Sequence, residues 1–387
     1  MKKKRSLIVV GLLLLLFFAY RIFVPDYAGV SSYKLTILYS ADQGSSVSAF
    51  SINNSGVVAG RVDRQATVWS STGEMRSLVK ENWKSSSCWK VADNRWMIIT
   101  AKTIQNEDRI FVWTPDGSLD LVEAPEGREI WLRDINDSGV AVGLIIPATW
   151  GTMPNEPVAF PVLIRSPTGE TTDLGFVSTT GGDLSINRKG EVAGTRWISK
   201  NKFHPDRGVN RACLWSATRG VVDLGTLGGE QSWATGLNDH GEVVGYSKLA
   251  DGTHYPFIWK GEEMKPLNTP NKNEGGARAI NNRGEVIGDY TLGGIQAPKS
   301  FRPLEKKFQR WAFEGLGWDY FPGQHRYFLW KDGVSIKVDA LHKDKASGHI
   351  FIPTDINDQG QIVGSGLFSH QKEEGVFLLT PAQEDHW

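Results

Sequence analysis

Signatures of several common enzyme and metal-binding classes are missing from this 387-residue chain. Its 8 His residues are scattered, and no two of them have the spacing of a zinc site. There is no Gly-x-Ser-x-Gly elbow, no phosphate-binding loop and no Gly-rich dinucleotide fingerprint. We therefore predict no metal and no cofactor, and we assign no catalytic residue from the sequence.

Cysteine is also scarce, since Cys88 and Cys213 are the only two in the sequence. The two residues fall at different positions of non-neighbouring repeats, which favours two buried thiols that pack as small apolar residues. A disulfide between them remains the alternative, because an oxidising compartment would permit one.

An excess of basic charge is absent too, because 43 Lys and Arg residues balance 43 Asp and Glu residues. Lys2, Lys3, Lys4, Arg5 and Arg21 are the only charged residues in the first 25 positions, so the remainder of the chain carries a formal charge of −5. No basic surface is evident, and we expect no nucleic acid partner.

The one long apolar run follows this basic tip, from Leu7 to Tyr20. The run becomes long enough to span a bilayer when residues up to Val24 are included. Arg21 would then extend its side chain so that its charge reaches the membrane interface. The segment Pro25–Gly29 is a poor cleavage site, which favours an uncleaved anchor over a cleaved signal peptide. No Cys lies near the run, which excludes a bacterial lipoprotein.

This pattern predicts the organisation of the chain. Residues 1–24 form a cytoplasmic tip and a membrane-spanning helix, residues 25–33 are a linker, and residues 34–387 are exported to the periplasm or the extracellular space. The membrane is therefore one predicted partner.

One short phrase recurs through the exported part, most clearly from Gly236 to Gly245: an apolar residue, Asn, two polar residues, Gly, any residue, two small or β-branched residues, and Gly. Asn followed three residues later by Gly suits a type I turn that continues into a left-handed residue, and such a turn closes a β-hairpin. The second Gly predicts a bulge or a close approach of two main chains. The other copies run from Ile52 to Gly60, Ile135 to Gly143, Ile186 to Gly194, Ile280 to Gly288 and Ile356 to Gly364. The predicted turn residues are Asn53, Gly56, Asn136, Gly139, Asn187, Gly190, Asn238, Gly241, Asn281, Gly284, Asn357 and Gly360.

A second hairpin follows each of these phrases, so that one unit has four strands, A to D. Its first strand often ends in Trp, at Trp69, Trp113, Trp215, Trp259 and Trp330. We expect these Trp residues to pack between neighbouring units, with a cofactor role as a minor alternative. The C strands expected from this pattern are 66–69, 111–113, 161–164, 212–215, 256–259, 327–330 and 375–379. A degenerate phrase from Val91 to Ile99, with Ala92 in the Asn position and Arg95 in the Gly position, brings the number of units to seven.

Most units are spaced by about 40 to 50 residues, the range of β-propeller blades. The last unit lacks a D strand, and an unpaired strand from Lys34 to Tyr39 precedes the first unit. Lending the N-terminal strand to the last blade would close a ring and limit exposed sheet edges. We predict an all-β, seven-bladed propeller closed in this way, with six or eight blades as the range of error.

The repeat resembles the HAF-type extracellular repeat family. The resemblance rests on Asp223–Gly229, Ala234–Gly241 and Phe257–Trp259. It extends from about Leu35 to Leu379, and the fourth and fifth units match most strongly. The His-Ala-Phe triplet of the family is replaced here, for example by Tyr255-Pro256-Phe257. The resemblance implies an exported repeat protein and no known reaction.

The direction of the strands separates two faces. The A–B and C–D turns are short and lie on one face, whereas the variable B–C and D–A loops lie on the other, which is the candidate binding face. The longest B–C connection is an insertion at residues 290–325, in which we expect a short helix that acts as a lid or as a ridge for a partner or a sugar. The candidate ligand-binding residues on the loops are Trp150, Trp197, His204, Trp311, Trp318 and Tyr320.

Acidic residues leave the biochemical activity open. Asp134–Gly139 and Asp355–Gly360 are similar to the start of a calcium loop, but strand residues follow where further ligands are needed, which disfavours calcium. The first hypothesis is a membrane-anchored, exported binding or scaffold module with a protein or glycan ligand on the long-loop face. The alternative is a carbohydrate-active hydrolase or lyase with carboxylates at the propeller funnel, and the third hypothesis is a structural envelope protein.

Overall fold

The computed structural model describes residues 32–41, 45–148, 159–179, 183–199, 208–270, 274–291, 325–342, 350–368 and 373–382. These residues form antiparallel strands, with a 3-10 helix η3 at Val338–Ala340. None of the helices within these ranges is long and apolar enough to cross a membrane. The predicted anchor at residues 1–24 and the part of the predicted insertion at residues 292–324 lie outside the described residues.

Four of the sheets are each built from four strands that are consecutive in the chain. The first contains β2 (Val47–Ile52), β3 (Val58–Val62), β4 (Gln65–Trp69) and β5 (Met75–Ser77), and the second contains β6 (Trp83–Val91), β7 (Met97–Thr103), β8 (Asp108–Trp113) and β9 (Leu119–Leu121). Two later sheets contain β18 (Ser232–Leu237), β19 (Val243–Lys248), β20 (His254–Lys260) and β21 (Glu263–Pro266), and β22 (Gly275–Ile280), β23 (Val286–Thr291), β24 (His325–Lys331) and β25 (Val334–Lys337).

Between them lies an eight-stranded sheet that contains two units. Its strands are β10 (Arg128–Ile135), β11 (Ala141–Pro147), β12 (Ala159–Arg165), β13 (Thr171–Thr179), β14 (Ser185–Ile186), β15 (Val192–Ser199), β16 (Gly208–Ser216) and β17 (Gly220–Asp223). The two units meet through one paired position, Ser178 with Arg196.

The two ends of the chain share the remaining sheet. β1 (Tyr33–Ser40) pairs antiparallel with β28 (Glu373–Pro381), next to β27 (Ile362–Phe368) and β26 (Ile350–Ile356). The prediction that the N-terminal strand pairs with the last strand of the chain is thus confirmed. The expected C strands also lie within observed strands, in β4, β8, β12, β16, β20, β24 and β28.

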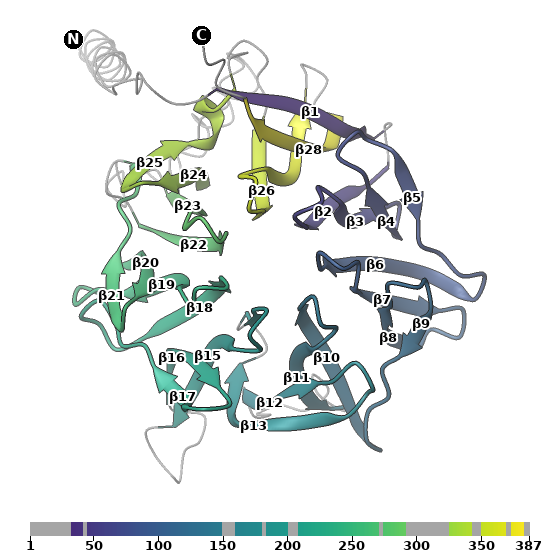
Figure 1. The fold of residues 1–387 in the computed structure, drawn as a ribbon, viewed down its shortest axis with the longest axis horizontal. Helices are drawn as coiled ribbons and strands as arrows, with labels where there is room; N and C mark the ends of the chain where they lie inside the picture. Colours follow the sequence, from purple (N-terminus) through teal and green to yellow (C-terminus); the bar gives the residue numbers. More distant parts are fainter. Residues whose placement is uncertain are drawn as a thin grey trace, which may run out of the picture.

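The sheets are arranged as a ring in Figure 1, which is a β-propeller-like arrangement. Strands such as β2, β6 and β10 lie nearest the centre, and strands such as β5, β9 and β1 lie at the outside. The first strand of each unit therefore borders the axis of the ring, and its side chains determine what the axis contains.

The Asn phrase forms the turn between the first two strands. In the first copy, Asn53 Oδ1 accepts the main-chain N–H groups of Ser55 and Val57, and the Gly56 N–H donates to the Asn53 carbonyl. Gly56 has a φ of +76°, which glycine adopts without a steric penalty. The other five complete copies have the same pattern. In the degenerate copy, Arg95 takes the left-handed conformation at a φ of +66°.

A β-bulge interrupts the first strand just before most of these turns. Pairing shifts by one residue at Phe50, Trp89, Arg133, Thr235, Arg278 and Thr354. Opposite the bulge, the second Gly of the phrase lies against the neighbouring main chain: a Cβ at Gly245 would be 1.9 Å from the carbonyl oxygen of Trp233. The bulge turns two successive side chains of the inner strand toward the axis.

Apolar clusters join each unit to the next. Trp69, which is fully buried, packs with Val58 of its own sheet and with Val363 and Val376 of the sheet that contains both ends of the chain. Trp113, Trp215, Trp259 and Trp330 lie in comparable clusters shared between consecutive units. The prediction that these Trp residues pack between units is confirmed.

Both cysteines are free and buried, so the disulfide alternative is wrong. Desolvation raises the pKa of the Cys88 and Cys213 thiols to about 12. They act as small core residues.

The close approach at the second Gly can be tested within one sheet. Ala at Gly288 would place Cβ 2.4 Å from the carbonyl oxygen of Gly276, whereas Ala at Gly276 meets nothing nearer than the Tyr246 ring at 3.4 Å. We expect Gly288→Ala to lower the free energy of unfolding by about 2 kcal/mol or more, and Gly276→Ala by less than about 1 kcal/mol. Denaturant unfolding of both variants checks this, and equal losses would contradict it.

Candidate functional site

A chain of side-chain amides joins the turns around the axis. The Nδ2 group of Asn187 donates to the carbonyl of Asn238 at 3.1 Å, and Asn238 donates to the carbonyl of Asn281 at 3.1 Å. The same contact links Asn53 to Ala92, Asn136 to Asn187, and Asn281 to Asn357. Asn357 donates at 3.0 Å to the carbonyl of Asn53, so the last phrase is bonded to the first.

Some of these amides also donate to a buried carboxylate four residues later in the chain. Nδ2 of Asn281 also donates to Glu285 Oε2 at 2.6 Å, and Arg283 and Lys331 pair with the same carboxylate at 2.6 and 3.1 Å. Glu285 is 3% exposed. Burial alone would raise its pKa, but the hydrogen bonds from Asn281, Arg283 and Lys331 outweigh burial and hold the pKa below its usual value of 4.5.

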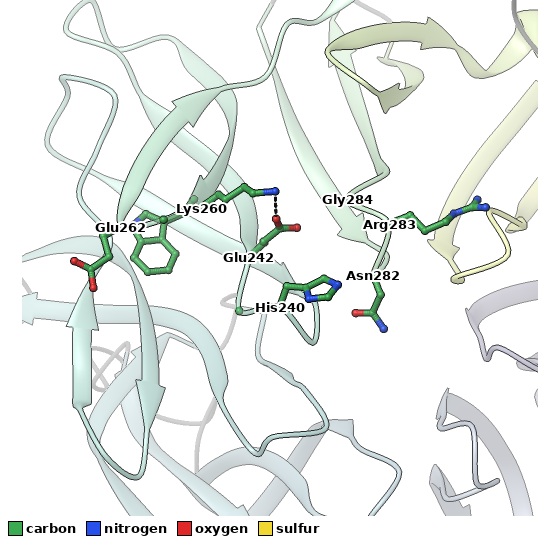
Figure 2. A pocket seen from close by; sticks show the side chains of 10 residues that line it. His240, Glu242, Lys260, Glu262, Asn282, Arg283 and Gly284 are labelled. Carbon is green, nitrogen blue, oxygen red and sulfur yellow. Dashed lines mark ion pairs between the residues drawn. The ribbon is translucent and has the colours of Figure 1, made fainter.

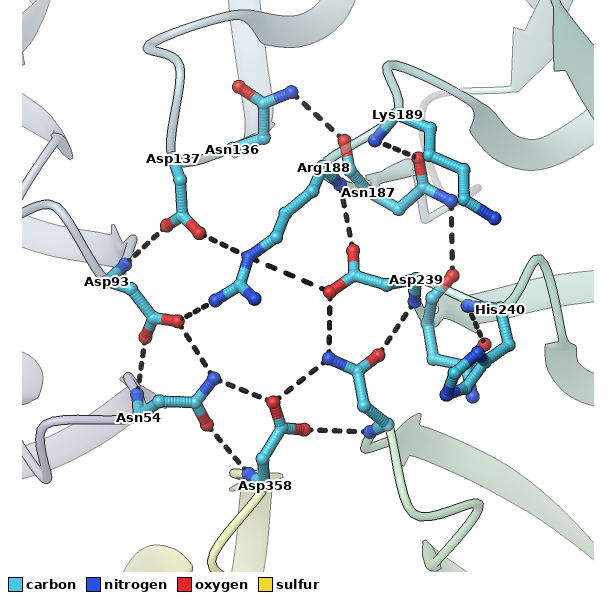
Figure 3. Close-up of polar contacts among 12 residues, drawn as sticks. Asn54, Asp93, Asn136, Asp137, Asn187, Arg188, Lys189, Asp239, His240 and Asp358 are labelled. Atoms are coloured by element: carbon cyan, nitrogen blue, oxygen red, sulfur yellow. Dashed lines mark hydrogen bonds and ion pairs between the residues drawn. The ribbon is translucent and has the colours of Figure 1, made fainter.

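The residue after each Asn forms a polar ring at the turn end of the axis (Figure 3). Asn54, Asp93, Asp137, Asp239, Asn282 and Asp358 each accept a main-chain N–H group from a neighbouring turn. Arg188 is the seventh residue, and its guanidinium lies inside the ring, where it binds Asp93 and Asp137 and lies 3.7 Å from Asp239.

A second charged group lies one step further along the axis. Lys90 Nζ lies 3.6 Å from Asp134 and 3.7 Å from Asp355, which come from three different sheets. Burial would lower the pKa of Lys90, but the two carboxylates raise it by more. Asp134 also accepts the N–H of Ile186 at 2.9 Å, and Asp355 accepts the N–H of Ile52 at 3.1 Å.

The turn phrases line a cavity of about 160 Å³ on the axis. Six Asp against one Lys and one Arg in its lining leave a formal charge of −4. The carboxylates are nonetheless engaged by main-chain N–H groups and by Lys90 and Arg188, and within the described ranges no three His, Cys, Asp or Glu side chains are grouped to hold a metal ion. This end of the axis is built to join the turns.

The other half of the axis, toward the long loops, has a different lining. Phe50 and Trp89 are bulge residues of adjacent sheets, and their rings stack with centroids 4.3 Å apart and planes at 23°. Trp89 is 43% exposed, and its Nε1 donates to Thr100 Oγ1 at 2.8 Å. A large aromatic ring is thus held in one orientation while much of it faces solvent.

Charged side chains at the same repeat position lie elsewhere on this lining. Arg133 and Arg278 are exposed bulge residues of β10 and β22, and exposed Asp183 interacts electrostatically with both. Desolvation by the surrounding protein raises the pKa of Asp183, and the positive charges of Arg133 and Arg278 oppose that rise. Arg278 also pairs through Nε with Asp289 at 2.8 Å and lies over the Tyr327 ring.

Further aromatic residues lie at the loop-side end of β18, β19 and β20. Trp233 stacks on Tyr246 at 4.9 Å, and His254 contacts the edges of both rings. Lys248 lies over Trp233.

The candidate binding site is the set Phe50, Trp89, Arg133, Asp183 and Arg278, which we call the loop-side set.

A separate pocket of about 540 Å³ opens on the turn side (Figure 2). Its lining includes His240, Glu242, Trp259, Lys260 and Arg283. Glu242 is buried and pairs with Lys260 at 2.6 Å, and it accepts from Asn238 at 2.7 Å. The carboxylate is therefore satisfied by the protein, as its equivalent Glu285 is.

Of the ligand-binding residues expected from sequence, only Trp197 lies in a described segment. Trp197 is half-exposed in β15, pairs with Asn210 and lies against Gly208, at the loop-side end of its sheet. Trp150, His204, Trp311, Trp318 and Tyr320 lie outside the described residues.

The residues of the loop-side set were not among those predicted from sequence, although four of them share one position in the repeat. Phe50, Trp89, Arg133 and Arg278 each lie three residues before the Asn position of their phrase. A position that is aromatic or cationic in four copies, within a regular repeat, marks the side chains at the axis.

No protein-family model matches the chain, and no curated protein matches it. Similar solved structures include a putative TolB from Agrobacterium tumefaciens, with 10% identity and a TM-score of 0.41 over 62% of this chain and 89% of that chain. A gluconolactonase from Xanthomonas campestris has 9% identity and a TM-score of 0.39 over 93% of this chain and 99% of that chain. A puromycin-hydrolyzing peptidase from Mycobacterium tuberculosis has 11% identity and a TM-score of 0.48 over 88% of this chain and 53% of that chain. Likenesses at this level transfer no activity to the chain.

The missing member of the amide chain gives a prediction. Ala92 occupies an Asn position and has no amide to donate to the Asn136 carbonyl. Ala92→Asn should add that bond and raise the free energy of unfolding by about 1 kcal/mol. Ala92→Asp has the same shape and can accept the turn N–H groups, but it has no donor and should give no gain. Chemical denaturation of the two variants decides, and an Asn variant no more stable than the Asp variant would contradict the role of the amide.

The lowered pKa of Glu285 predicts a pH dependence. Because the folded pKa lies below the unfolded value of 4.5, this stabilisation is complete above about pH 4.5 and is lost as the pH falls through the folded pKa. Glu285→Gln should lower the free energy of unfolding by about 1–3 kcal/mol at pH 7 and by clearly less at pH 3. Glu262→Gln, at an exposed ion pair with Arg219, is the control and should have little effect at either pH. A Glu285→Gln deficit of equal size at pH 7 and pH 3 would refute the assignment.

Proposed function

We propose that this chain is a membrane-anchored, exported, seven-bladed β-propeller that serves as a binding or scaffold module. Its ligand, a protein or a glycan, binds at the long-loop end of the axis. The Asn turns at the opposite end hold the blades together.

Seven blades follow when the eight-stranded sheet is divided at its single joining pair, Ser178 with Arg196, into two four-stranded blades. The pairing of β1 with β28 and the hydrogen bond from Asn357 to Asn53 support a closed ring. Both contacts join segments more than 300 residues apart, which an open array of blades does not require.

The anchor and the export of the propeller rest on the sequence. Four basic residues precede the apolar run from Leu7, and the remainder of the chain carries an opposite net charge. The resemblance to HAF-type extracellular repeats is consistent with a propeller outside the cytoplasm.

The exposed ring of Trp89 is the observation that carries the binding proposal. Large exposed aromatic side chains that are fixed by their neighbours are typical of binding hot spots. Trp89 is fixed by Phe50 and Thr100. It occupies the same bulge position of its inner strand as Arg133 and Arg278, with which Asp183 interacts electrostatically. Aromatic, cationic and anionic groups together are able to orient a ligand.

A hydrolase or lyase remains the second candidate, since Asp183 has a raised pKa of the kind that a general acid requires. Such an enzyme needs a second carboxylate at the reacting bond. Asp134 and Asp355 do converge, but on Lys90 and on main-chain N–H groups near the turn end. Their engagement supports binding as the first candidate.

The proposal predicts that binding depends on Trp89. The full-length protein should retain a component of the polysaccharide or protein fraction of its host's cell envelope, and Trp89→Ala should weaken that retention at least about tenfold. Met75→Ala removes another exposed apolar side chain, 49% exposed on outer strand β5, and should leave retention unchanged. Equal retention by wild type, Trp89→Ala and Met75→Ala would overturn the proposal.

A further inference from the structure

We infer that the loop-side set recognises a neutral sugar unit of an oligosaccharide, with the pyranose ring against Trp89 and its hydroxyl groups between Asp183 and Arg278. This inference rests on the proposed binding function and names its ligand class. Three properties of the described residues support it: a fixed aromatic face, paired donors and acceptors, and the distribution of charge along the axis.

The aromatic face is prepared before a ligand arrives. Phe50 covers part of Trp89, and Arg61 lies 6.0 Å from the Phe50 centroid, so that a cation and two rings support one another. The hydrogen bond from Trp89 Nε1 to Thr100 satisfies the polar edge of the indole. The remaining exposed face is flat and apolar, and it can receive the C–H face of a sugar at little cost in side-chain entropy.

The polar groups suit hydroxyl groups. Arg278 bonds Asp289 through Nε, and its terminal amino groups make no hydrogen bond within the described residues. Asp183 is an exposed carboxylate that interacts electrostatically with Arg133 and Arg278 from two other inner strands. Adjacent hydroxyl groups of a sugar donate to a carboxylate and accept from a guanidinium, so a site with both groups satisfies them in pairs.

Charge distinguishes a neutral sugar from an ionic one. Arg133 and Arg278 are balanced by Asp183 and Asp289, so these four groups together offer no net positive charge to an acidic sugar. The lining of the cavity further along the axis carries a formal charge of −4, which repels an anion. A cationic sugar placed beside Asp183 would be repelled by the Arg133 and Arg278 guanidinium groups that interact with that carboxylate. A neutral unit avoids both penalties.

The space between the walls is limited, which favours a single chain of sugars over a broad protein surface. Lys90 and Asp134 follow Trp89 and Arg133 in the chain, and they lie 3.6 Å apart although they belong to two different sheets. The inner strands therefore face one another across a distance that side chains span. A flat protein surface cannot enter such a space, whereas the end of a glycan chain can.

Titration of the full-length protein with oligosaccharides tests this inference. The probes are neutral hexasaccharides (cellohexaose, maltohexaose and N-acetylated chitohexaose), with hexagalacturonate as the acidic probe and fully deacetylated chitohexaose as the cationic probe. We expect at least one neutral probe to bind by calorimetry, and the acidic and cationic probes to bind at least about tenfold more weakly. Tighter binding of either ionic probe than of any neutral probe would overturn the inference.

Variants separate the aromatic face from general damage to the fold. Trp89→Ala should weaken binding of the neutral probe at least about tenfold, and Trp89→Phe should restore part of the loss because it keeps a flat ring. Met75→Ala should bind as the wild type does. Equal affinities of Trp89→Ala and Met75→Ala for the neutral probe would overturn the inference.

The two proposals fail in different ways. If no hexasaccharide binds but Trp89→Ala still abolishes retention of the envelope fraction, the sugar class is wrong and the binding function stands. If retention is also independent of Trp89, both proposals are wrong.

Discussion

The structure depends on one repeated hydrogen bond, from the side-chain amide of a turn Asn to the main-chain carbonyl of the next turn. Each amide serves twice, because Oδ1 closes its own turn while Nδ2 reaches the neighbouring one. Aspartate at this position would close the turn, but its carboxylate would not donate the second bond. The choice of Asn at this position is therefore required by the bond between units as well as by the turn.

This bond determines what can occupy the axis. It brings the turns together, and the residues beside Asn are then forced into one polar ring. Four of those residues are Asp, and their repulsion is offset by Arg188 inside the ring and by main-chain N–H groups. Groups satisfied in this way have little left to offer a ligand. The side chains of the loop-side half are not needed to join the turns, and they differ between copies of the repeat. Phe50 and Trp89 occupy the bulge position in two adjacent sheets, and Arg133 and Arg278 occupy it in two others.

Much of the fold could be predicted because its signals are local. Asn238 and Gly241 indicate a turn through their own conformational preferences, Gly245 indicates a close approach, and Trp259 marks the end of a strand. Even the pairing of β1 with β28 followed from counting strands. Each of these inferences needs only neighbouring residues or the order of the units.

The lining of the axis was harder to predict because its residues, those of the candidate site included, come together only when the sheets are arranged around the axis. Lys90, Asp134 and Asp355 lie far apart in the chain, and nothing in their local sequence links them. The bulge also breaks the alternation by which a strand's inner and outer residues are usually distinguished, so Trp89 and Lys90 both turn toward the axis. The expectation that function lies at the loop end was reached from loop lengths, and most of the residues chosen for it were on the loops. Four of the five residues of the loop-side set lie on first strands of their units instead, and Asp183 lies just before β14.

Native-state hydrogen exchange of the turn glycines tests the central claim most directly, because each Gly N–H donates to the Asn carbonyl of its own turn. If the amide chain joins the first and last phrases, Gly56 and Gly360 should exchange with the same high free energy as Gly190 and Gly241, close to that of global unfolding. Faster exchange at Gly56 and Gly360 alone, as expected for fraying ends of an open array, would contradict the account.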